Sequence, residues 1–459
     1  MKTPSLYILL VLIIMLCGCK KDFLEAKPST RLVTPKTLED FRAMLENVDN
    51  LNRATPGLLQ MASDDYIFIS NAFWQGTIFN AERNSYIWAT DLYEDQRGIK
   101  DWSVGFSAIF ICNNVLEGLK NIAVNAENQK EWNNIKGRAL FMRAYVLYDL
   151  VRSFAPVYDI NTSTTALGMP LRLTPGIDEI KPRSTVEQTY NRIFTDLTEA
   201  TGLLMPEMEI NYKQRPSKVA AMALLSRIYL SMCRYDKAEE YADLTLNLYR
   251  TLIDYNTIDV SEKHPFSMNN AETILNTTVI NNYYSIILNL DLNEAITINP
   301  ELYDLYEVND LRKDIYFATN LRTGFLYKKF SYAGPVGVPF TGLATDEIFL
   351  IKAECLARKN KVSDALSVLN SLLINRYKTG TFIPINAIDP ADALNKVLLE
   401  RRKELVWRSL RWSDLKRLNK EGANITLKRK INGQDYILPP NDPKYVFPIP
   451  KEETERSGN

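Results

Sequence analysis

The chain has 459 residues, and its 55 basic side chains are balanced by 55 acidic ones, with no long run of one sign. This balance argues against strong electrostatic binding to nucleic acid or to an anionic lipid surface. His264 is the only histidine, which argues against histidine zinc sites, serine or cysteine triads and histidine acid–base catalysis. The sequence contains no glycine-rich phosphate loop.

The first nineteen residues predict export from the cytoplasm. Lys2 is followed by an unbroken apolar run over residues 6–16 and then by the sequence Leu-Cys-Gly-Cys, which ends at Cys19. A basic start, a short apolar stretch and small residues at its end are typical of a secretory signal, too short to span a bilayer. The ending resembles a bacterial lipobox, so we expect a signal peptide over residues 1–18 and lipidation of Cys19. An ordinary cleaved signal with an incidental cysteine is the alternative.

The segment after the anchor changes character twice before the first long helix. Residues 19–35 are polar and contain proline, as expected of a tether to a domain over 36–459. A first helix is predicted from Thr37 to Val48. Residues 64–100 are rich in aromatic side chains and asparagine and have little helical period, so we expect long ordered loops. The next predicted helix runs over 101–120, and one of its faces carries Trp102, Phe106, Ile109 and Asn113.

Helical periodicity dominates two regions, about 130–250 and 345–419. The first contains predicted helices at 130–154, 184–205, 217–233 and 236–250. The side-chain pattern of the helices at 217–233 and 236–250 recurs 127 residues further along the chain. This recurrence predicts a second helical pair whose turn lies at residues 359–361. Such spacing is typical of tetratricopeptide-type hairpins; two unrelated hairpins are the alternative. We expect a third pair from 134–154 and 184–205, separated by a proline-rich segment at 155–183.

Residues 255–345 interrupt this helical order with asparagine, tyrosine, threonine and proline. Strand-like runs occur at 273–280 and 285–290. An insertion of about ninety residues is long for a connection in a compact domain, and long insertions usually carry function. The final predicted element is one long amphipathic helix over 391–419.

Three cysteines remain beyond the signal: Cys112, Cys233 and Cys355. They lie far apart in predicted helices and are odd in number, which fits buried small side chains better than a disulfide framework or a metal site. We therefore predict no metal and no cofactor.

Several short motifs are spread along nearly the whole chain. They include Asp22-Phe23-Leu24-Glu25 after Cys19, the helix face with Trp102 and Asn113, Arg143-Ala144-Tyr145, Pro182-Arg183-Ser184-Thr185, Glu404-Leu405, Arg411-Trp412 and Phe447-Pro448-Ile449-Pro450. In this order and spacing they resemble the RagB/SusD family of nutrient-binding outer-membrane lipoproteins. Three features depart from the family pattern: Ala155 in place of the usual glycine, Arg408-Ser409-Leu410 in place of Glu-Gly, and a short tail after Pro450.

This resemblance implies a mostly α-helical, SusD-like fold in which tetratricopeptide-type hairpins scaffold a loop-rich ligand face with a few short strands. It also implies a lid on a SusC-like, TonB-dependent β-barrel transporter, to which the protein presents glycans or, in some members, peptides. The expected location is the outer membrane, lipid-anchored and facing the cell exterior.

Binding a neutral glycan calls for exposed aromatic rings flanked by polar side chains within hydrogen-bonding reach. Within the predicted ligand face, over 64–100 and 255–345, we select as candidates Asp64, Trp74, Asn80, Arg83, Tyr86, Trp88, Tyr283 and Tyr284. For Tyr86 and Trp88 the alternative is packing against the helix below. Adjacent residues of a strand point to opposite faces, so at most one of Tyr283 and Tyr284 lines a site.

Two other readings of the sequence are weaker. Trp407 and Trp412 lie among several arginines, but interleaved carboxylates favour a structural ion-pair network over a nucleic-acid surface. A glycoside hydrolase needs two carboxylates across a cleft, and nothing in the sequence selects such a pair. We therefore predict a non-enzymatic protein that captures oligosaccharides, with a peptide-binding protein, a hydrolase and a protein–protein adaptor as alternatives.

Overall fold

A computed structural model describes residues 35–176, 180–283, 294–335 and 337–457. Cys19, the predicted signal and most of the tether therefore lie outside the described residues. The fold is mostly α-helical, which confirms the predicted class, and its strands are two to five residues long. None of the helices in the described ranges is long and apolar enough to cross a membrane.

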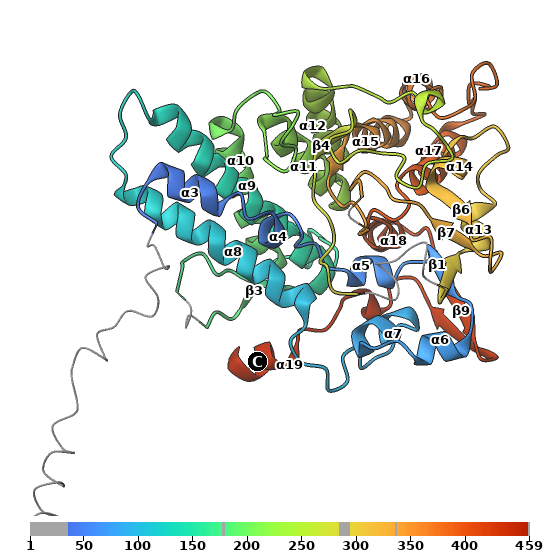
Figure 1. Cartoon of the computed structure of the whole chain (residues 1–459), viewed down its shortest axis with the longest axis horizontal. Helices are drawn as coiled ribbons and strands as arrows, with labels where there is room; N and C mark the ends of the chain where they lie inside the picture. Colours follow the sequence, from blue (N-terminus) through green and yellow to red (C-terminus); the bar gives the residue numbers. More distant parts are fainter. Residues whose placement is uncertain (1–34, 177–179, 284–293, 336, 458–459) are drawn as a thin grey trace, which may run out of the picture.

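Long helices form the scaffold across the upper and middle parts of Figure 1. Their bounds are α8 Lys100–Gly118, α9 Gln129–Phe154, α10 Val186–Leu203, α11 Lys218–Ser231, α12 Tyr235–Leu248, α15 Thr345–Arg358, α16 Val362–Leu373, α17 Pro390–Glu404 and α18 Arg411–Lys420. Side chains fix several starts: Thr185 and Gln188 form a capping box on α10, and Ser217 caps α11. The helix α9 is almost wholly buried from Ile135 onward, because α8 and α10 pack against it.

The recurring helical pair predicted from the sequence is confirmed as two hairpins, α11–α12 and α15–α16, and α12 also packs against α15. Small residues permit the close approach: Ala238 and Ala365 are fully buried, and the Ser226 hydroxyl donates to the Ala238 carbonyl at 3.0 Å. The predicted third pair is α9 with α10. Between them, residues 155–183 contribute the strand β2, Leu167–Pro170, which pairs antiparallel with β3, Arg183–Thr185.

Short elements make up the rest of the chain, and many of them lie below and to the right of the scaffold in Figure 1. The short helices are α3 Leu38–Met44, α4 Val48–Leu51, α5 Leu58–Met61, α6 Asn71–Gln75, α7 Asn80–Tyr86, α13 Pro300–Tyr303, α14 Arg312–Tyr316 and α19 Lys451–Ser457. The antiparallel strand pairs are β1 Tyr66–Phe68 with β5 Ile296–Ile298, β4 Thr273–Leu275 with β8 Leu343–Ala344, β6 Phe317–Thr319 with β7 Leu326–Lys328, and β9 Leu427–Ile431 with β10 Gln434–Leu438.

Several predicted elements need correction. The helix expected over 37–48 ends early, because α3 stops at Met44 and Asn47 then caps a second helix, α4, that begins at Val48. Residues 64–100 contain α6 and α7 as well as loops. The strand expected over 273–280 is only three residues long, and the one expected at 285–290 lies outside the described residues.

The prediction of a single helix over 391–419 is wrong, because this segment breaks into α17 and α18. Trp407 and Ser409 adopt φ values of 58° and 55°, a left-handed conformation that interrupts a right-handed helix. Tertiary hydrogen bonds hold this break: the Trp407 amide donates to Asp65 at 3.3 Å, and the Ser409 amide donates to Gln60 at 3.2 Å. The distant segment 60–65 thus overrides the local helical preference.

The three cysteines are free, as predicted. Cys112 and Cys355 are buried, and Cys233 is partly buried just after α11. Burial raises the pKa of the Cys112 thiol to about 12, so this side chain behaves as a small apolar group.

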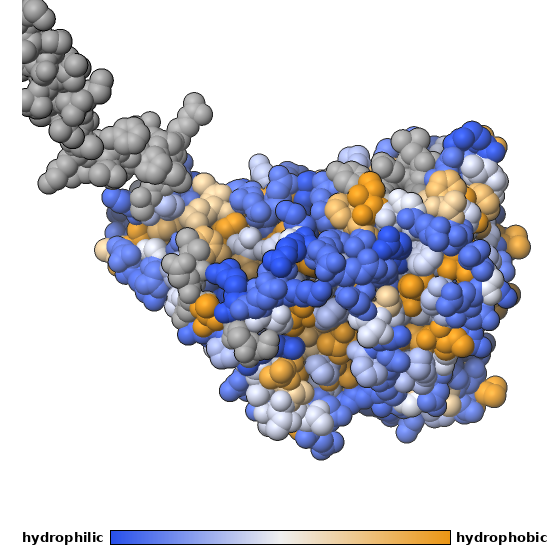
Figure 2. Space-filling view, turned by 90° about the horizontal axis from the view of Figure 1, so that it is seen from below, coloured by the Kyte–Doolittle hydropathy of each residue, from blue (hydrophilic) through white to orange (hydrophobic). Residues whose placement is uncertain are grey.

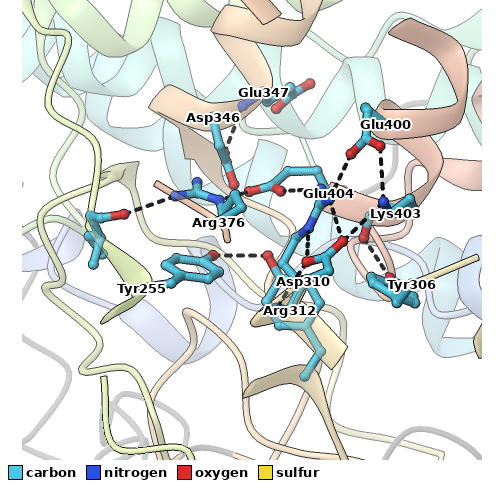
Figure 3. A network of polar contacts seen from close by, with 12 residues as sticks. Tyr255, Tyr306, Asp310, Arg312, Asp346, Glu347, Arg376, Glu400, Lys403 and Glu404 are labelled. Carbon is cyan, nitrogen blue, oxygen red and sulfur yellow. Dashed lines mark hydrogen bonds and ion pairs between the residues drawn. The ribbon is translucent and has the colours of Figure 1, made fainter. Parts of the chain in front are cut away.

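A buried ionic network joins the insertion at 255–345 to the helical scaffold (Figure 3). Arg312 binds Asp310 and Glu400, each at 2.7 Å, and Glu404 at 2.9 Å. Arg376 binds the other oxygen of Glu404 at 2.7 Å and Glu272 at 2.8 Å. Lys403 contacts Asp310 and Glu400, while Arg408 binds Asp346 at 2.5 Å. Because β4, α14, α15 and α17 flank these residues, the network fixes how the insertion sits on the repeats.

Gly342→Ala should lower the free energy of unfolding by about 1–3 kcal/mol. A Cβ at Gly342 would collide with the Leu275 carbonyl oxygen and lie 2.7 Å from the Phe340 ring. That carbonyl belongs to β4, so relief of the collision requires β4 and β8 to separate. Urea titration measures the change.

Gly202→Ala is the matched control for this substitution. Gly202 lies in α10, and a Cβ there meets nothing within 4 Å. Alanine at this position should be neutral or stabilise by up to about 1 kcal/mol. Equal losses in the two variants would contradict the role assigned to the β4–β8 contact.

Candidate functional site

Three of the predicted ligand-binding rings are buried in the core. Trp88, Tyr86 and Tyr283 are only 4%, 1% and 0% exposed. Trp88 donates its indole N–H to the Ala62 carbonyl at 3.0 Å, and the Arg429 guanidinium lies 4.0 Å from the Tyr86 ring centroid and 4.8 Å from that of Trp88. Rings enclosed in this way cannot stack on a sugar. For these three residues the prediction is corrected, and packing, the stated alternative for Tyr86 and Trp88, is what the structure shows.

The Tyr283–Tyr284 pair is described only in part. The Tyr283 hydroxyl donates to the buried carboxylate of Asp101, which fixes the insertion against the start of α8. Tyr284 lies outside the described residues.

Trp74, Asn80 and Arg83 form a half-buried cluster on α6 and α7. The Trp74 indole donates to the Arg83 carbonyl at 3.0 Å, and the Arg83 guanidinium donates to Asn80 at 3.1 Å and to Glu94 at 3.2 Å. Their polar groups are largely engaged with one another. A role in ligand binding stays a prediction for this cluster.

Asp64 serves as an anchor for α17 and α18. Its carboxylate accepts two hydrogen bonds from Arg411 at 2.8 Å and lies 3.3 Å from Arg402. Burial alone would raise the pKa of Asp64, but the guanidinium groups of Arg402 and Arg411 hold it well below its ordinary value. A ligand at Asp64 would have to compete with this bidentate pair, so the structure favours a structural role over the predicted binding role.

The arginines around Trp407 and Trp412 form the predicted ion-pair network. Arg417 binds Glu354 at 2.6 Å and Asp414 at 2.8 Å, and Arg401 binds Asp414 at 2.9 Å. Both tryptophan side chains are fully buried. This confirms the interpretation of the sequence, since neither the rings nor these charges are available to a nucleic acid.

One group of carboxylates is close enough to suggest a metal. Among the described residues, oxygens of Glu272, Asp346 and Glu404 lie within 4.8 Å of one another. Each of these carboxylates is already bound by Arg376 or Arg408. The guanidinium groups offset the charge that would attract a cation, so we assign this group to the buried ionic network, part of which Figure 3 shows.

A cleft of about 580 Å³ runs along the outer side of α8. The N-terminal end of α8 and the helix α19 lie together at the bottom of Figure 1. On the face seen from below, apolar residues form separate patches between polar ones (Figure 2). The cleft is lined by Asn50, Trp102, Ser103, Phe106, Ser107, Ile109, Phe110, Ile111, Asn113, Arg172, Thr174, Gly176, Ile180, Glu453 and Arg456.

The helical period of α8 supplies the aromatic wall of this cleft. Trp102, Phe106 and Phe110 are four residues apart and therefore share one side of the helix. The ring centroids of Trp102 and Phe106 are 4.8 Å apart, and the Arg172 guanidinium lies 4.5 Å from that of Phe106. Phe110 is 38% exposed, so of these three rings it is the one most open to a ligand.

Polar groups fix the opposite wall. Asn113 accepts from Arg143 at 2.9 Å and donates to the carbonyls of Arg172 and Thr174 at 2.9 and 3.1 Å. This amide therefore positions the loop that carries Arg172.

Ser103 and Ser107 are exposed on the α8 side of the cleft, where their hydroxyls can hydrogen-bond a polar ligand. Aromatic surface with nearby hydroxyl, guanidinium and carboxylate groups suits a ligand with both C–H faces and polar edges.

Family models match most of the chain. One, described as starch-binding associating with outer membrane, matches residues 22–230, and another, described as the SusD family, matches residues 345–459. The chain belongs to the SusD/RagB family. The resemblance noted in the sequence is thereby confirmed.

One relative, the SusD-like protein P2 of Formosa agariphila, is 23% identical over an alignment of 418 residues that covers 78% of each chain. Solved SusD-type structures share the fold. A SusD superfamily protein from Bacteroides vulgatus superposes with a TM-score of 0.73 at 22% identity, covering 93% of this chain and 98% of its own. A second protein of that organism, described as a putative sugar binding protein, gives a TM-score of 0.72 at 22% identity, with the same coverage.

The described residues that the sequence predicted to bind a ligand do not line this cleft. Trp102, Phe106, Ile109 and Asn113 were recognised as one helix face, and all four line the cleft. Arg172 and Glu453 were not singled out, since they lie far from α8 in the sequence. Phe110 was missed as well, although its spacing of four residues from Phe106 was a usable signal.

Proposed function

We propose that this SusD/RagB protein captures oligosaccharides at the cell surface and delivers them to a TonB-dependent β-barrel transporter in the outer membrane. Family membership supports a binding protein, and the matching family model is described as starch-binding and outer-membrane-associated. A solved structure of the same fold is described as a SusD-like carbohydrate binding protein, with a TM-score of 0.68. The predicted lipidation of Cys19 would hold the protein at the membrane, because multiple acyl chains make a stable anchor.

The observation that carries the proposal is the cleft along α8. Its volume of about 580 Å³ falls within the range usual for small-molecule sites. Phe110 offers an accessible ring, the serine hydroxyls offer polar partners on the same wall, and Arg172 offers one on the opposite wall. In this arrangement, affinity would come from ring stacking on sugar C–H faces together with hydrogen bonds to hydroxyls.

Phe110→Ala should weaken oligosaccharide binding about 5- to 10-fold, since loss of one stacking ring costs about 1–1.5 kcal/mol. Calorimetry with the best ligand from a glycan array measures the change. Phe325→Ala is the matched control, because Phe325 is 40% exposed but does not line the cleft. Equal effects of the two substitutions, or none from Phe110→Ala, would remove the cleft from the proposal.

Delivery to a transporter is tested separately. A gentle detergent pull-down of the lipidated protein from its own outer membrane should bring with it a large TonB-dependent barrel. Recovery of the protein alone would contradict the delivery step. Release of new reducing ends from a bound oligosaccharide would instead favour the hydrolase alternative.

A further inference from the structure

The helix α19, Lys451–Ser457, borders the cleft and is held there through polar contacts. Its sequence, Lys-Glu-Glu-Thr-Glu-Arg-Ser, contains no apolar side chain. Glu452 accepts from the Gly98 amide at 2.6 Å, Lys451 donates to the Glu94 carbonyl at 3.1 Å, and Glu455 lies 3.6 Å from Arg97. The Glu455–Arg97 pair is exposed and contributes little to stability, and the other two contacts are single hydrogen bonds, so α19 has few interactions outside the cleft that its displacement would break.

One residue of α19 reaches into the cleft and occupies its polar groups. The Glu453 carboxylate pairs with the Arg172 guanidinium through one oxygen and accepts from the Trp102 indole N–H at 3.3 Å through the other. The Nε of Arg172 is buried and makes no hydrogen bond to another described residue. Arg172 therefore keeps a free donor beside the carboxylate that it already binds.

We propose that Glu453 occupies a carboxylate subsite, and that the cleft takes oligosaccharides containing uronic acids, whose carboxylate replaces that of Glu453. This inference rests on the proposed function and specifies its substrate class. A guanidinium fork and an indole N–H that engage the two oxygens of one planar group match the geometry of a carboxylate.

The charge of the cleft agrees with this exchange. Its charged lining residues, within the described chain, are Arg172, Arg456 and Glu453. Arg456 lies on α19 with Glu453, so displacement of this helix leaves Arg172 as the charged group among the described lining residues, and an acidic sugar would neutralise it. A neutral sugar would either leave Arg172 without its partner or bind beside the seated α19. An acidic ligand thus forms an ion pair with Arg172 that a neutral ligand cannot form.

The test compares oligomers of galacturonate, glucuronate and mannuronate with their methyl esters, titrated into the full mature protein at low salt. At least one acid should bind at least tenfold more tightly than its ester. Arg172→Gln should reduce this preference to within twofold. Glu453→Gln removes the competing carboxylate, so it should raise affinity for the acid about 3- to 10-fold and leave that for the ester unchanged. Glu455→Gln, on the same helix but paired with Arg97 outside the cleft, should change neither.

Other results overturn the carboxylate subsite and differ in what they leave standing. If neutral oligosaccharides bind at the cleft, no acid binds more tightly than its ester and Glu453→Gln has no effect, then oligosaccharide capture remains but the subsite does not. If an acidic peptide binds with dependence on Arg172 and no oligosaccharide binds, the ligand class is a peptide. If no oligosaccharide of either kind binds, the proposed function falls together with the subsite.

Discussion

Arg376→Ala should lower the free energy of unfolding by about 3–5 kcal/mol, because it leaves the buried carboxylate of Glu272 without its arginine and removes one of the two arginines that bind Glu404. Arg376 is fully buried and binds both Glu404 and Glu272. Its Nη1 also donates to the Ile253 carbonyl at 2.9 Å, so three segments lose a common partner at once. Urea titration followed by tryptophan fluorescence measures the change.

Arg42→Ala is the control for the arginine substitution. Arg42 also pairs with a glutamate, Glu131, at 2.8 Å, but both side chains are more than 40% exposed. Solvent already screens this pair, so its removal should not shift the urea midpoint measurably. A similarly small effect of Arg376→Ala would show that the network of Figure 3 does not hold the insertion on the scaffold.

Stability should fall as the pH rises from about 5 to 7, and Glu272 should account for the fall. Burial raises the pKa of Glu272 to about 7 from an ordinary value of 4.5, with contributions from the carboxylates of Asp346 and Glu404, although Arg376 opposes the shift. The folded state therefore retains a proton that the unfolded state has already released. The stability that this proton contributes is complete below pH 4.5 and is lost as the pH rises through 7, a change of about 3 kcal/mol.

The charges of the network give a reason for this proton. Among the described residues, five carboxylates are joined by these contacts to four cations: Glu272, Asp310, Asp346, Glu400 and Glu404 against Arg312, Arg376, Lys403 and Arg408. A buried site with one excess negative charge is relieved when one acid binds a proton.

Glu272→Gln should make the stability nearly independent of pH between 5 and 7, which urea midpoints at half-unit intervals measure. Two other buried groups act mainly above this window. Burial lowers the pKa of Lys328 and Lys416 to about 7, so their contribution to stability rises with pH between 7 and 10.5. Glu131→Gln, at an exposed pair, should retain the fall seen in the parent protein. A Glu272→Gln profile parallel to the parent's would assign the proton elsewhere.

Much of the scaffold was predictable because its helices carry local signals. The apolar period of α8 to α12 and the recurrence of the α11–α12 pattern in α15–α16 specify buried faces that lie within single segments. The structural role of the arginines near Trp412 was predictable for a similar reason, since their carboxylate partners Asp414 and Glu354 lie on helices that the sequence identifies.

The ligand face was predicted less well, because its composition does not show which rings are exposed. Tyr86 and Trp88 lie in a segment of suitable composition, yet Arg429, more than 300 residues later, closes over both rings. Some of the aromatic side chains of 64–100 that suggested a glycan-binding surface thus belong to the buried core.

The sequence by itself determined the helical class, the repeated hairpins and the aromatic face of α8, because the signal for each lies within a few helical turns. It also determined the family, through short motifs spread along nearly the whole chain. Tertiary structure alone decided the break between α17 and α18, since contacts from Gln60 and Asp65 stabilise a left-handed conformation that local preference disfavours. It also decided the cleft, where α8 meets Arg172 and Glu453. Such sites depend on which distant segments come into contact. The local sequence around each residue does not reveal these contacts.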